Sequence, residues 1–520
     1  MKRSTALAFL LTCALIRPAS AEDLENPFEK SSPASPRTKI DAFVFTKLKT
    51  LGVQPAHPCS DAVFLRRVYL DAIGTLPGRQ EVKAFLSDPD PKKRVILIDR
   101  LLEREEFADY WALKWSDLLR VKSEFPINLW PNAVQAFHRW IRTSIRENLP
   151  YDRFVREMLT SSGSNFRVPQ VNFYRAVRSK EPKAIAQTVA LTFMGARAEK
   201  WPEDRLAGMA SFFSQIEFKA TAEWKEEIVI FNPAKTLPKA VFPDGKTARL
   251  APAQDPREIF ADWLIGPGNP WFARNIANRV WSWLMGRGII HEPDDIRPDN
   301  PPANPDLLAY LERELIASHY DLKHLYRLIL NSETYQLSSI PASEKPPDAG
   351  SFACYPLRRL EAEVLIDALD QITGTSEQYS SAIPEPYTFI PENRRSIALA
   401  DASITSPFFE TFGRPPRDTG LESERNNTPT AAQQLHLLNS THIQRKIEQG
   451  PALASLLRAA GSNRQELVND LFLTILSRYP TQDEVKNVAA YYQSFAGNKR
   501  DALIDIVWAL INSAEFLCRH

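Results

Sequence analysis

Cysteine and glycine are both scarce in this chain of 520 residues, which holds 4 cysteines and 18 glycines against 40 prolines. Such a balance favours helices that end at prolines over glycine loops that cradle nucleotide phosphates. No Walker loop, dinucleotide fingerprint, GxSxG elbow or HExxH motif occurs in the sequence. The cysteines show no CxxC spacing, and the sequence does not select a disulfide pair among Cys59, Cys354 and Cys518.

An excess of charge of one sign is also missing, because 64 Lys and Arg balance 63 Asp and Glu for a net charge of +1. Nucleic-acid binding proteins carry a basic excess, so we expect no nucleic-acid partner. Hydrophobic residues make up 44% of the chain, which is typical of a globular protein. No stretch beyond the N-terminus is long and apolar enough to span a bilayer, and we expect no transmembrane segment in the mature chain.

The N-terminus has the features of a secretory signal peptide. Lys2 and Arg3 precede an apolar run at 6–16, and Ala19-Ser20-Ala21 fits a small-x-small cleavage site. The run is shorter than the roughly 20 residues that a spanning helix needs. We therefore expect a signal peptide at 1–21 and an exported protein, in the periplasm or cell envelope. Removal of the signal peptide takes away three positive charges and changes the net charge from +1 to −2.

Helical periodicity dominates the rest of the chain. It predicts a mainly α fold of two helical domains with a small β hairpin or strand pair between them. After a Ser/Pro-rich linker at 22–38, we expect an N-terminal helical domain at 39–220 and a β-containing connector at 221–254. The C-terminal helical domain is expected at 255–520.

Local signals mark the boundaries within this pattern. Between residues 227 and 250, the β-branched and aromatic run at 228–231 and the turn signal at 243–245 predict a small strand pair. Asp255 before Pro256 predicts the first turn of a helix. The stretch at 376–419 is rich in Pro, Ser and aromatic residues, and it predicts a long irregular loop.

Two sets of motifs divide the chain in the same way as its helical pattern. They are FLRRVYLD at 64–71 and NLPYDRF at 148–154 in the first half, and NPWFAR at 269–274, NRVW at 278–281 and FGRPPR at 412–417 in the second. On these motifs, residues 40–213 resemble the planctomycete cytochrome-linked domain of unknown function 1549. Residues 255–520 resemble its usual partner, domain of unknown function 1553. The resemblance implies an exported two-domain protein.

The departures from this family predict a member without haem. The family often carries a CxxCH motif, the attachment site of c-type haem, just after a helix that ends in Phe-x-Gly. Here Phe193-Met194-Gly195 is followed by residues 196–201, which contain neither cysteine nor histidine. The family's Cys-Glu-Cys-Glu-Arg pattern reads Leu421-Glu422-Ser423-Glu424-Arg425, and Asn304, a good helix cap, replaces the histidine of a third motif. We expect a haem-less paralogue with no cofactor.

A polar face on one predicted helix is a candidate for binding. Arg274, Asn278 and Arg279 are flanked by two tryptophans, and arginine and asparagine beside aromatic rings can bind a carboxylate, a sulfate or sugar hydroxyls. The alternative is an internal polar network that pins this helix against the acidic loop Asp294-Asp295, because buried arginine is normally paired. With a second cluster after the irregular stretch, the predicted polar binding site comprises Arg274, Asn278, Arg279, Trp281, Asp294, Asp295, Glu422, Glu424 and Arg425.

Metal ligation is not predicted. The nearest histidine pairs are His319 with His324 and His436 with His442, and neither spacing places two rings on one helix face. The aspartates at 294–299 could gather round a hard cation, but isolated loop aspartates more often act as caps and turn residues. We therefore expect no metal site.

Two main hypotheses of function follow, and whether the protein is an enzyme stays open. The first is a binding or assembly component of the cell envelope, with a cell-envelope protein or polysaccharide as its partner. The alternative is an enzyme or accessory protein that acts on an extracellular glycan or related polymer, with residues 274–281 and 422–425 lining its site. A third hypothesis, electron transfer through non-covalent haem, has no residue assigned as a ligand. A cleft rich in Arg, Asn and Trp favours the enzyme, and a flat or apolar patch favours assembly.

Overall fold

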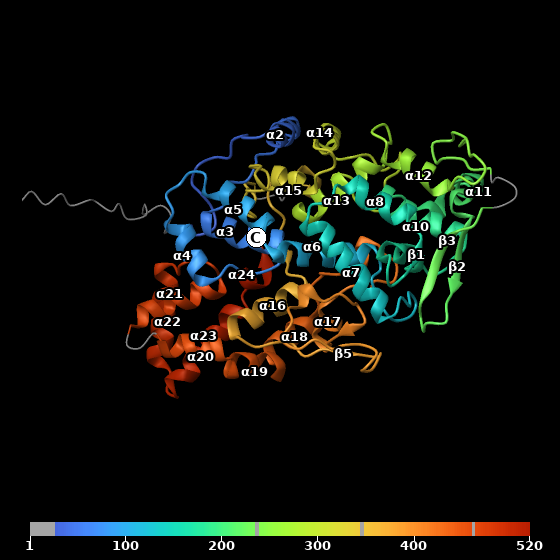
Figure 1. Cartoon of the computed structure of the whole chain (residues 1–520). Helices are drawn as coiled ribbons and strands as arrows, with labels where there is room; N and C mark the ends of the chain where they lie inside the picture. The colour runs from blue at the N-terminus through green and yellow to red at the C-terminus, as the bar shows by residue number, and fades with distance from the viewer. Residues whose placement is uncertain (1–25, 234–238, 344–347, 460–462) are drawn as a thin grey trace, which may run out of the picture.

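The computed structural model of the chain describes residues 26–233, 239–343, 348–459 and 463–520. The predicted signal peptide and the start of the predicted linker lie outside these residues. Helices dominate the described part and the strands are few and short, which confirms the mainly α prediction (Figure 1). None of the helices in the described ranges combines the length and apolar composition that a bilayer crossing needs.

The part of the chain before residue 215 is built from short helices. They are α2 (Lys39–Leu51), α3 (Asp61–Ile73), α4 (Arg79–Ser87), α5 (Lys93–Leu102), α6 (Glu105–Leu118), α7 (Pro131–Arg146), α8 (Tyr151–Thr160), α9 (Asn172–Arg175), α10 (Pro182–Met194) and α11 (Glu203–Ala210). Local chemistry sets where they begin: Thr38 and Asp41 form a capping box at the start of α2. Proline is the first residue of α7 and α10, where a missing N–H costs nothing.

Helices also make up most of the chain after residue 255. They are α12 (Pro256–Ile265), α13 (Phe272–Met285), α14 (Pro305–Ala317), α15 (Leu322–Leu330), α16 (Ala362–Thr373), α17 (Pro407–Phe412), α18 (Ala431–Asn439), α19 (Thr441–Gln449), α20 (Pro451–Ala459), α21 (Arg464–Ile475), α22 (Gln482–Ser494), α23 (Lys499–Ile511) and α24 (Ala514–Leu517). Asp255 caps α12 by accepting a hydrogen bond from the Arg257 N–H, as its sequence predicts. Asn304 caps α14 in the same way through the Leu307 N–H. The predicted irregular stretch at 376–419 contains only short elements, including α17.

The largest sheet confirms a strand at residues 228–231, but its neighbours differ from the prediction. The strands β1 (Gly163–Ser164), β2 (Ile216–Ala220) and β3 (Glu227–Phe231) pair antiparallel in the order β1-β3-β2, with Phe218 opposite Val229. The turn signal at 243–245 closes only an isolated bridge between Val241 and Thr247. The prediction of a strand pair within 227–250 is therefore wrong about the second strand, which is β2 and precedes that range. A hairpin with β2 is favoured because sequential strands joined by a short turn usually pair.

Two smaller pairs of strands complete the β-structure of the described residues. One joins β4 (Arg358–Arg359) to β7 (Cys518–Arg519), and the other joins β5 (Ser380–Ser381) to β6 (Ile404–Thr405). The first pair brings the segment before α16 next to the residues that follow α24, and it places Arg519 in the interior.

Helix α3 lies in the interior, next to α4, α5 and the C-terminal end of the chain on the left of Figure 1. Every residue from Val63 to Ile73 is buried, so a helix with no exposed face carries its charged residues into the core. Arg66 donates hydrogen bonds to the carbonyls of Ile475 and Phe516, each at 2.9 Å. Arg67 donates to the carbonyls of Tyr335 and Leu337 at 2.6 and 2.8 Å and to that of His520 at 2.8 Å. The helix thus binds backbone groups from far along the chain.

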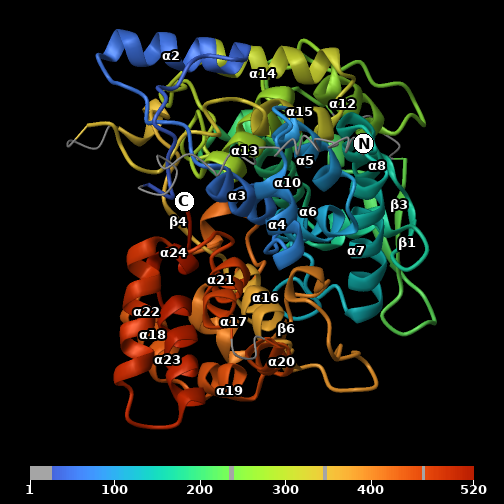
Figure 2. The same cartoon turned by 90° about the vertical axis from the view of Figure 1, so that its left-hand side faces the viewer.

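The two predicted helical domains share one continuous hydrophobic core. At the top of Figure 2, α2 lies beside α14, where the rings of Phe43 and Tyr310 are 5.6 Å apart and Asn304 donates a hydrogen bond to the Phe43 carbonyl. The helices from α18 to α23 form a lobe at the bottom of the same view. The domain boundaries drawn from sequence stay a prediction, and the residues on either side of them pack together.

Candidate functional site

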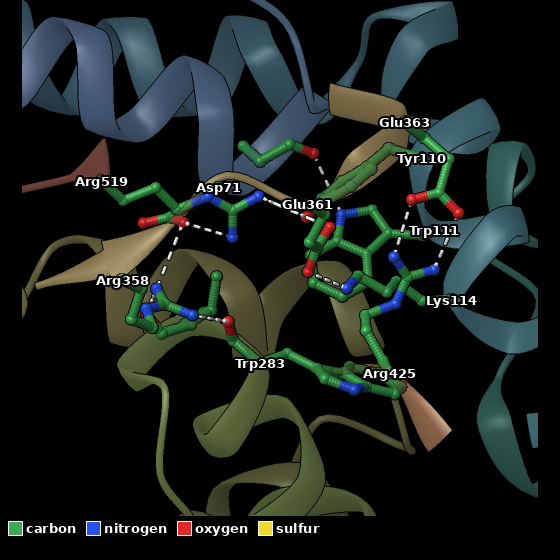
Figure 3. A network of polar contacts seen from close by, with 12 residues as sticks. Asp71, Tyr110, Trp111, Lys114, Trp283, Arg358, Glu361, Glu363, Arg425 and Arg519 are labelled. Atoms are coloured by element: carbon green, nitrogen blue, oxygen red, sulfur yellow. Dashed lines mark hydrogen bonds and ion pairs between the residues drawn. The ribbon is translucent and has the colours of Figure 1, made fainter. Parts of the chain in front are cut away.

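Several buried charges meet where the two halves of the chain contact each other (Figure 3). Asp71, in α3, accepts hydrogen bonds from the hydroxyls of Tyr335 and Tyr355 at 2.8 and 2.7 Å. Its other carboxylate oxygen lies 3.2 Å from Arg519 and 3.4 Å from Arg358. The Asp71 side chain is fully buried, so these four partners replace the water that it loses on folding.

Glu361, which precedes α16, is the next member of the network. Lys114 of α6 donates a hydrogen bond to one carboxylate oxygen. The Tyr110 hydroxyl donates to the other at 3.0 Å, and Arg519 lies 3.6 Å from it. Burial by itself raises the pKa of Glu361, but the attraction of Lys114 and Arg519 is stronger and holds that pKa well below its usual value. Glu361 is therefore a carboxylate in the folded protein.

Arg425 joins two carboxylates from different parts of the chain. Its guanidinium binds Glu363 through two hydrogen bonds of 2.7 and 3.1 Å, and it binds Asp117 through two more of 2.7 and 3.2 Å. Arg417 donates to the second oxygen of Asp117 at 2.8 Å. Burial raises the pKa of Asp117, but Arg425 and Arg417 outweigh this effect and lower it. Bidentate pairing of this kind gives strong and directional contacts.

A third group links α13 to the loops around residues 294 and 422. Arg279 lies 2.7 Å from Asp294, and both side chains are buried. The other oxygen of Asp294 accepts the backbone N–H of Glu422 at 2.6 Å. The Glu422 carboxylate lies 3.6 Å from Arg279 and accepts the Trp283 indole N–H at 3.2 Å. Burial raises the pKa of Glu422 in spite of the attraction of Arg279.

Little space remains among these charges. The gap beside Lys114, Asp117, Glu422 and Arg425 amounts to about 10 Å³, which is room for one water molecule. Four residues of the predicted site thus lie in an internal polar network, which the sequence analysis gave as the alternative to a binding site. They are Arg279, Asp294, Glu422 and Arg425. Binding of a ligand by these four residues stays a prediction that requires the network to open.

Three further residues of the predicted site contact backbone or core. Asn278 accepts the N–H of Ile290 at 2.8 Å and donates to its carbonyl at 2.9 Å. Trp281 packs edge-on against Phe352, with ring centroids 5.1 Å apart. Glu424 accepts the backbone N–H groups of Asp418 and Thr419 at 3.2 and 2.8 Å. Each of them fixes the conformation of a loop or a helix.

The remaining two predicted residues, Arg274 and Asp295, line an open cleft of about 580 Å³. Its walls come from the segment between α10 and α11, from the start of α13 and from the loop at 290–302. Its charged and aromatic lining includes Arg197, Lys200, Trp201 and Arg205 from the first half and Trp271 and Arg274 from the second. With Asn300 in its lining, the cleft has the Arg, Asn and Trp composition that favours the enzyme.

Positive charge exceeds negative charge in the cleft. Five cationic side chains line it against two carboxylates, Asp295 and Asp299. Both carboxylates are paired with Arg297, at 3.0 and 2.8 Å. Arg274 pairs with Glu312 at 2.8 Å. Within the described residues, Arg197 and Lys200 form no ion pair, so their charge is available to a ligand.

Sequence reasoning did not assign Arg197, Lys200, Trp201 and Arg205 to a site. Their signal was present, since three cations fall within nine residues around a tryptophan. Arg197, Lys200 and Trp201 belong to the segment that replaces the haem motif, and Arg205 lies four residues after it. Their meeting with Trp271 and Arg274 depends on the packing of α10 against α13, where Asn275 donates a hydrogen bond to the Thr192 carbonyl at 3.0 Å.

The segment at 196–201, where the resembling family often has its haem motif, forms one wall of this cleft. It follows Gly195, whose φ of +61° ends α10 and whose carbonyl accepts the Ile296 N–H at 2.8 Å. The residues that follow offer Arg197, Glu199 and Lys200, and no thiol or imidazole, to a porphyrin. Cys59, Cys354 and Cys518 are free cysteines elsewhere in the fold. The residues present do not fit a covalently attached haem.

The two histidines at 436 and 442 do come together, although their spacing is not that of a helix face. Their ring nitrogens are 3.4 Å apart, and His442 lies 2.9 Å from a carboxylate oxygen of Glu377. Lys446 approaches the same carboxylate at 3.4 Å, so a cation already occupies its neighbourhood. In the portion of the chain that the structure describes, no cluster of three or more His, Cys, Asp or Glu has the arrangement of a metal site.

The protein is a mainly helical one with buried charges in its core and an open basic cleft. Comparison with protein families shows which family it belongs to. Residues 39–209 match the family described as protein of unknown function (DUF1549), and residues 256–492 match the one described as protein of unknown function (DUF1553). The chain belongs to the family in which these two domains follow one another. Neither the curated proteins nor the solved structures include a match to it.

Proposed function

We propose that this protein is an exported, haem-less member of the DUF1549–DUF1553 family. It binds a component of the cell envelope through the cleft that is lined by Arg197 and Arg274. The cleft is the observation that carries the proposal. Where relatives often have a haem motif, this chain has a wall with a tryptophan and two cations that form no ion pair with any residue the structure describes. Its volume lies within the range of ligand sites, roughly 300–1,000 Å³.

The glycan-acting enzyme is the second candidate, and the two tryptophans of the cleft favour it. Glycoside hydrolysis uses two carboxyl groups, one as an acid and the other as a base or nucleophile. Both carboxylates of the cleft, Asp295 and Asp299, are paired with Arg297. Glu361 and Glu363 lie in the buried network with their own cationic partners. Binding without cleavage is therefore the better supported activity.

Export and the lack of haem are tested by producing the full chain in a bacterium that has a periplasm. We expect a periplasmic protein whose mass begins at Glu22 and whose visible spectrum lacks a Soret band. A chain without residues 2–21 is the control and should stay in the cytoplasm. Cytoplasmic full-length protein, or a Soret band, would contradict the proposal.

Binding is tested by incubating the purified mature chain with solubilised envelope fractions and identifying what is retained by native mass spectrometry. The double variant Arg197→Gln/Lys200→Gln should lose most of the retained material. A matched double variant, Arg146→Gln/Lys486→Gln, removes two exposed charges elsewhere and should retain it. Equal retention by both variants would show that the cleft is not the binding site.

A further inference from the structure

We infer that the ligand of the cleft is an anionic sugar of an acidic polysaccharide, carrying a sulfate ester or a carboxylate on a ring that packs against tryptophan. The inference rests on the proposed function and names its ligand class. It combines three properties of the cleft: cations without an ion pair in the described part of the chain, aromatic faces and rigid walls.

The cations supply the anion site. Lys200 is exposed and Arg197 is half-buried, and the buried Nε of Arg197 has no hydrogen-bond partner among the described residues. Guanidinium groups match a pair of oxygens on a carboxylate or a sulfate and form charge-assisted hydrogen bonds with them. Because cations are in surplus, the cleft repels a cationic ligand. The same charges add little to the affinity for a neutral ligand.

The aromatic residues supply the surface for the sugar ring. The Arg205 guanidinium lies 4.0 Å from the centre of the Trp201 ring and 5.8 Å from that of Trp271. Its Nε donates to the Pro243 carbonyl at 3.0 Å, which fixes the side chain. Trp201 and Trp271 are both partly exposed, so the cleft joins apolar ring surface to fixed hydrogen-bond donors. A sugar with its apolar C–H face and charged substituent has the complementary pattern.

The walls of the cleft are rich in proline. Pro202, Pro270, Pro298, Pro301 and Pro302 line it, and each of these residues has a fixed φ. The loop at 290–302 is tied down by the Ile296–Gly195 hydrogen bond and by Asn300, which donates to the Asp295 carbonyl at 2.9 Å. A site that is already ordered loses less conformational entropy when it binds a ligand.

Affinity electrophoresis of the mature chain through gels that contain a polysaccharide tests the inference. Dextran and dextran sulfate have the same backbone and differ in charge, and polygalacturonate carries carboxylates in place of sulfates. We expect retardation by one or both acidic polymers and none by dextran. The acidic polymer that retards more strongly identifies the anion as sulfate or carboxylate.

Variants assign the retardation to the cleft. Arg197→Gln/Lys200→Gln should weaken binding by roughly tenfold to a hundredfold, the loss expected for two charge-assisted hydrogen bonds. Trp201→Ala should weaken binding to the acidic polymer by about tenfold. Arg146→Gln/Lys486→Gln and Trp508→Ala, at exposed positions elsewhere, should bind as the wild type does. Circular dichroism confirms that each variant is folded.

Three outcomes would overturn the inference. They are retardation by dextran as strong as by its sulfate, retardation that the cleft variants and the matched controls lose equally, and no retardation by either acidic polymer. If the envelope experiment above still recovers a ligand through the cleft, the proposed function stands and only the ligand class is wrong.

Discussion

The guanidinium of Arg519, in β7, lies 3.2 Å from the carboxylate of Asp71, in α3, and both side chains are almost completely buried. This pair joins a buried helix of the first half to the strand that pairs with β4. Two buried charges that satisfy each other contribute little net stability, because each has lost its water. Removal of one partner is costly, since the other charge stays buried and is left with fewer partners.

Arg519→Met is therefore expected to lower the free energy of unfolding by about 3–5 kcal/mol. Urea denaturation of the mature chain, followed by tryptophan fluorescence, measures the change. Arg146→Met, at an exposed arginine whose partner is also exposed, should change stability by less than about 0.5 kcal/mol. Equal stability of the two variants would show that the Asp71 contact has no structural role.

The Lys114–Glu361 pair predicts a non-additive result. Lys114→Met leaves a buried carboxylate without its lysine and should cost about 3–5 kcal/mol. In the double variant Lys114→Met/Glu361→Gln the charge is gone, while the amide oxygen can still accept from Tyr110. The double variant should therefore be more stable than Lys114→Met alone. A double-mutant cycle measured by denaturation gives the coupling energy, and simple additivity would contradict the ion pair.

His138 predicts a specific loss of stability in acid. Burial, together with the positive charges of Arg417 and Arg394, lowers its pKa from 6.5 to about 3. Between these values the unfolded chain binds a proton that the folded protein does not, so the free energy of unfolding falls as the pH falls. At pH 4.5 the loss due to this residue is about 2–3 kcal/mol.

The test is denaturation at pH 7 and pH 4.5. His138→Leu should lose about 2–3 kcal/mol less than the wild type on acidification, because leucine cannot take up a proton in the unfolded chain. His57→Leu, at a partly exposed histidine, is the control. An unchanged pH dependence in His138→Leu would show that the imidazole is protonated in the folded protein.

Gly195 is expected to tolerate no side chain. Its φ is +61°, and an added Cβ would lie 2.6 Å from Asn275 Oδ1 and 2.9 Å from the Pro293 carbonyl. Gly52 has a similar φ of +67° but open space around it. Gly52→Ala should cost about 1 kcal/mol from backbone strain alone, and Gly195→Ala about 3 kcal/mol from strain and overpacking. Equal costs, measured by denaturation, would show that the 290–302 loop moves aside.

Helix positions could be predicted from sequence because their signals are local. Asp255 and Asn304 cap their helices through N–H groups only two or three residues away. The Arg279–Asp294 pair, offered as an alternative to a binding site, spans 15 residues and could also be anticipated. The β3 strand was predicted from its own residues, but its partner was not, because pairing depends on the turn at 221–226 and not on the strand.

The long-range partners were beyond such reasoning. Asp117 pairs with Arg417 and Arg425 across 300 and 308 residues, and nothing in the neighbourhood of any of the three specifies the others. The cleft has the same origin, since Arg197 and Arg274 come from segments that meet only when α10 packs on α13. The cluster of basic residues near position 200 can be recognised in the sequence, but the opposite side of the cleft cannot.

The arginines of α3 have a consequence for how this protein is made. Arg66 and Arg67 donate to carbonyls that lie between 268 and 453 residues further along the chain. A ribosome has released α3 long before it synthesises those acceptors. The nascent first half cannot reach the final structure in the meantime, because the carbonyls that accept the hydrogen bonds of these two guanidinium groups are not yet made. Assembly is in effect postponed to the end of translation, and a polypeptide interrupted midway is left as a substrate for proteases.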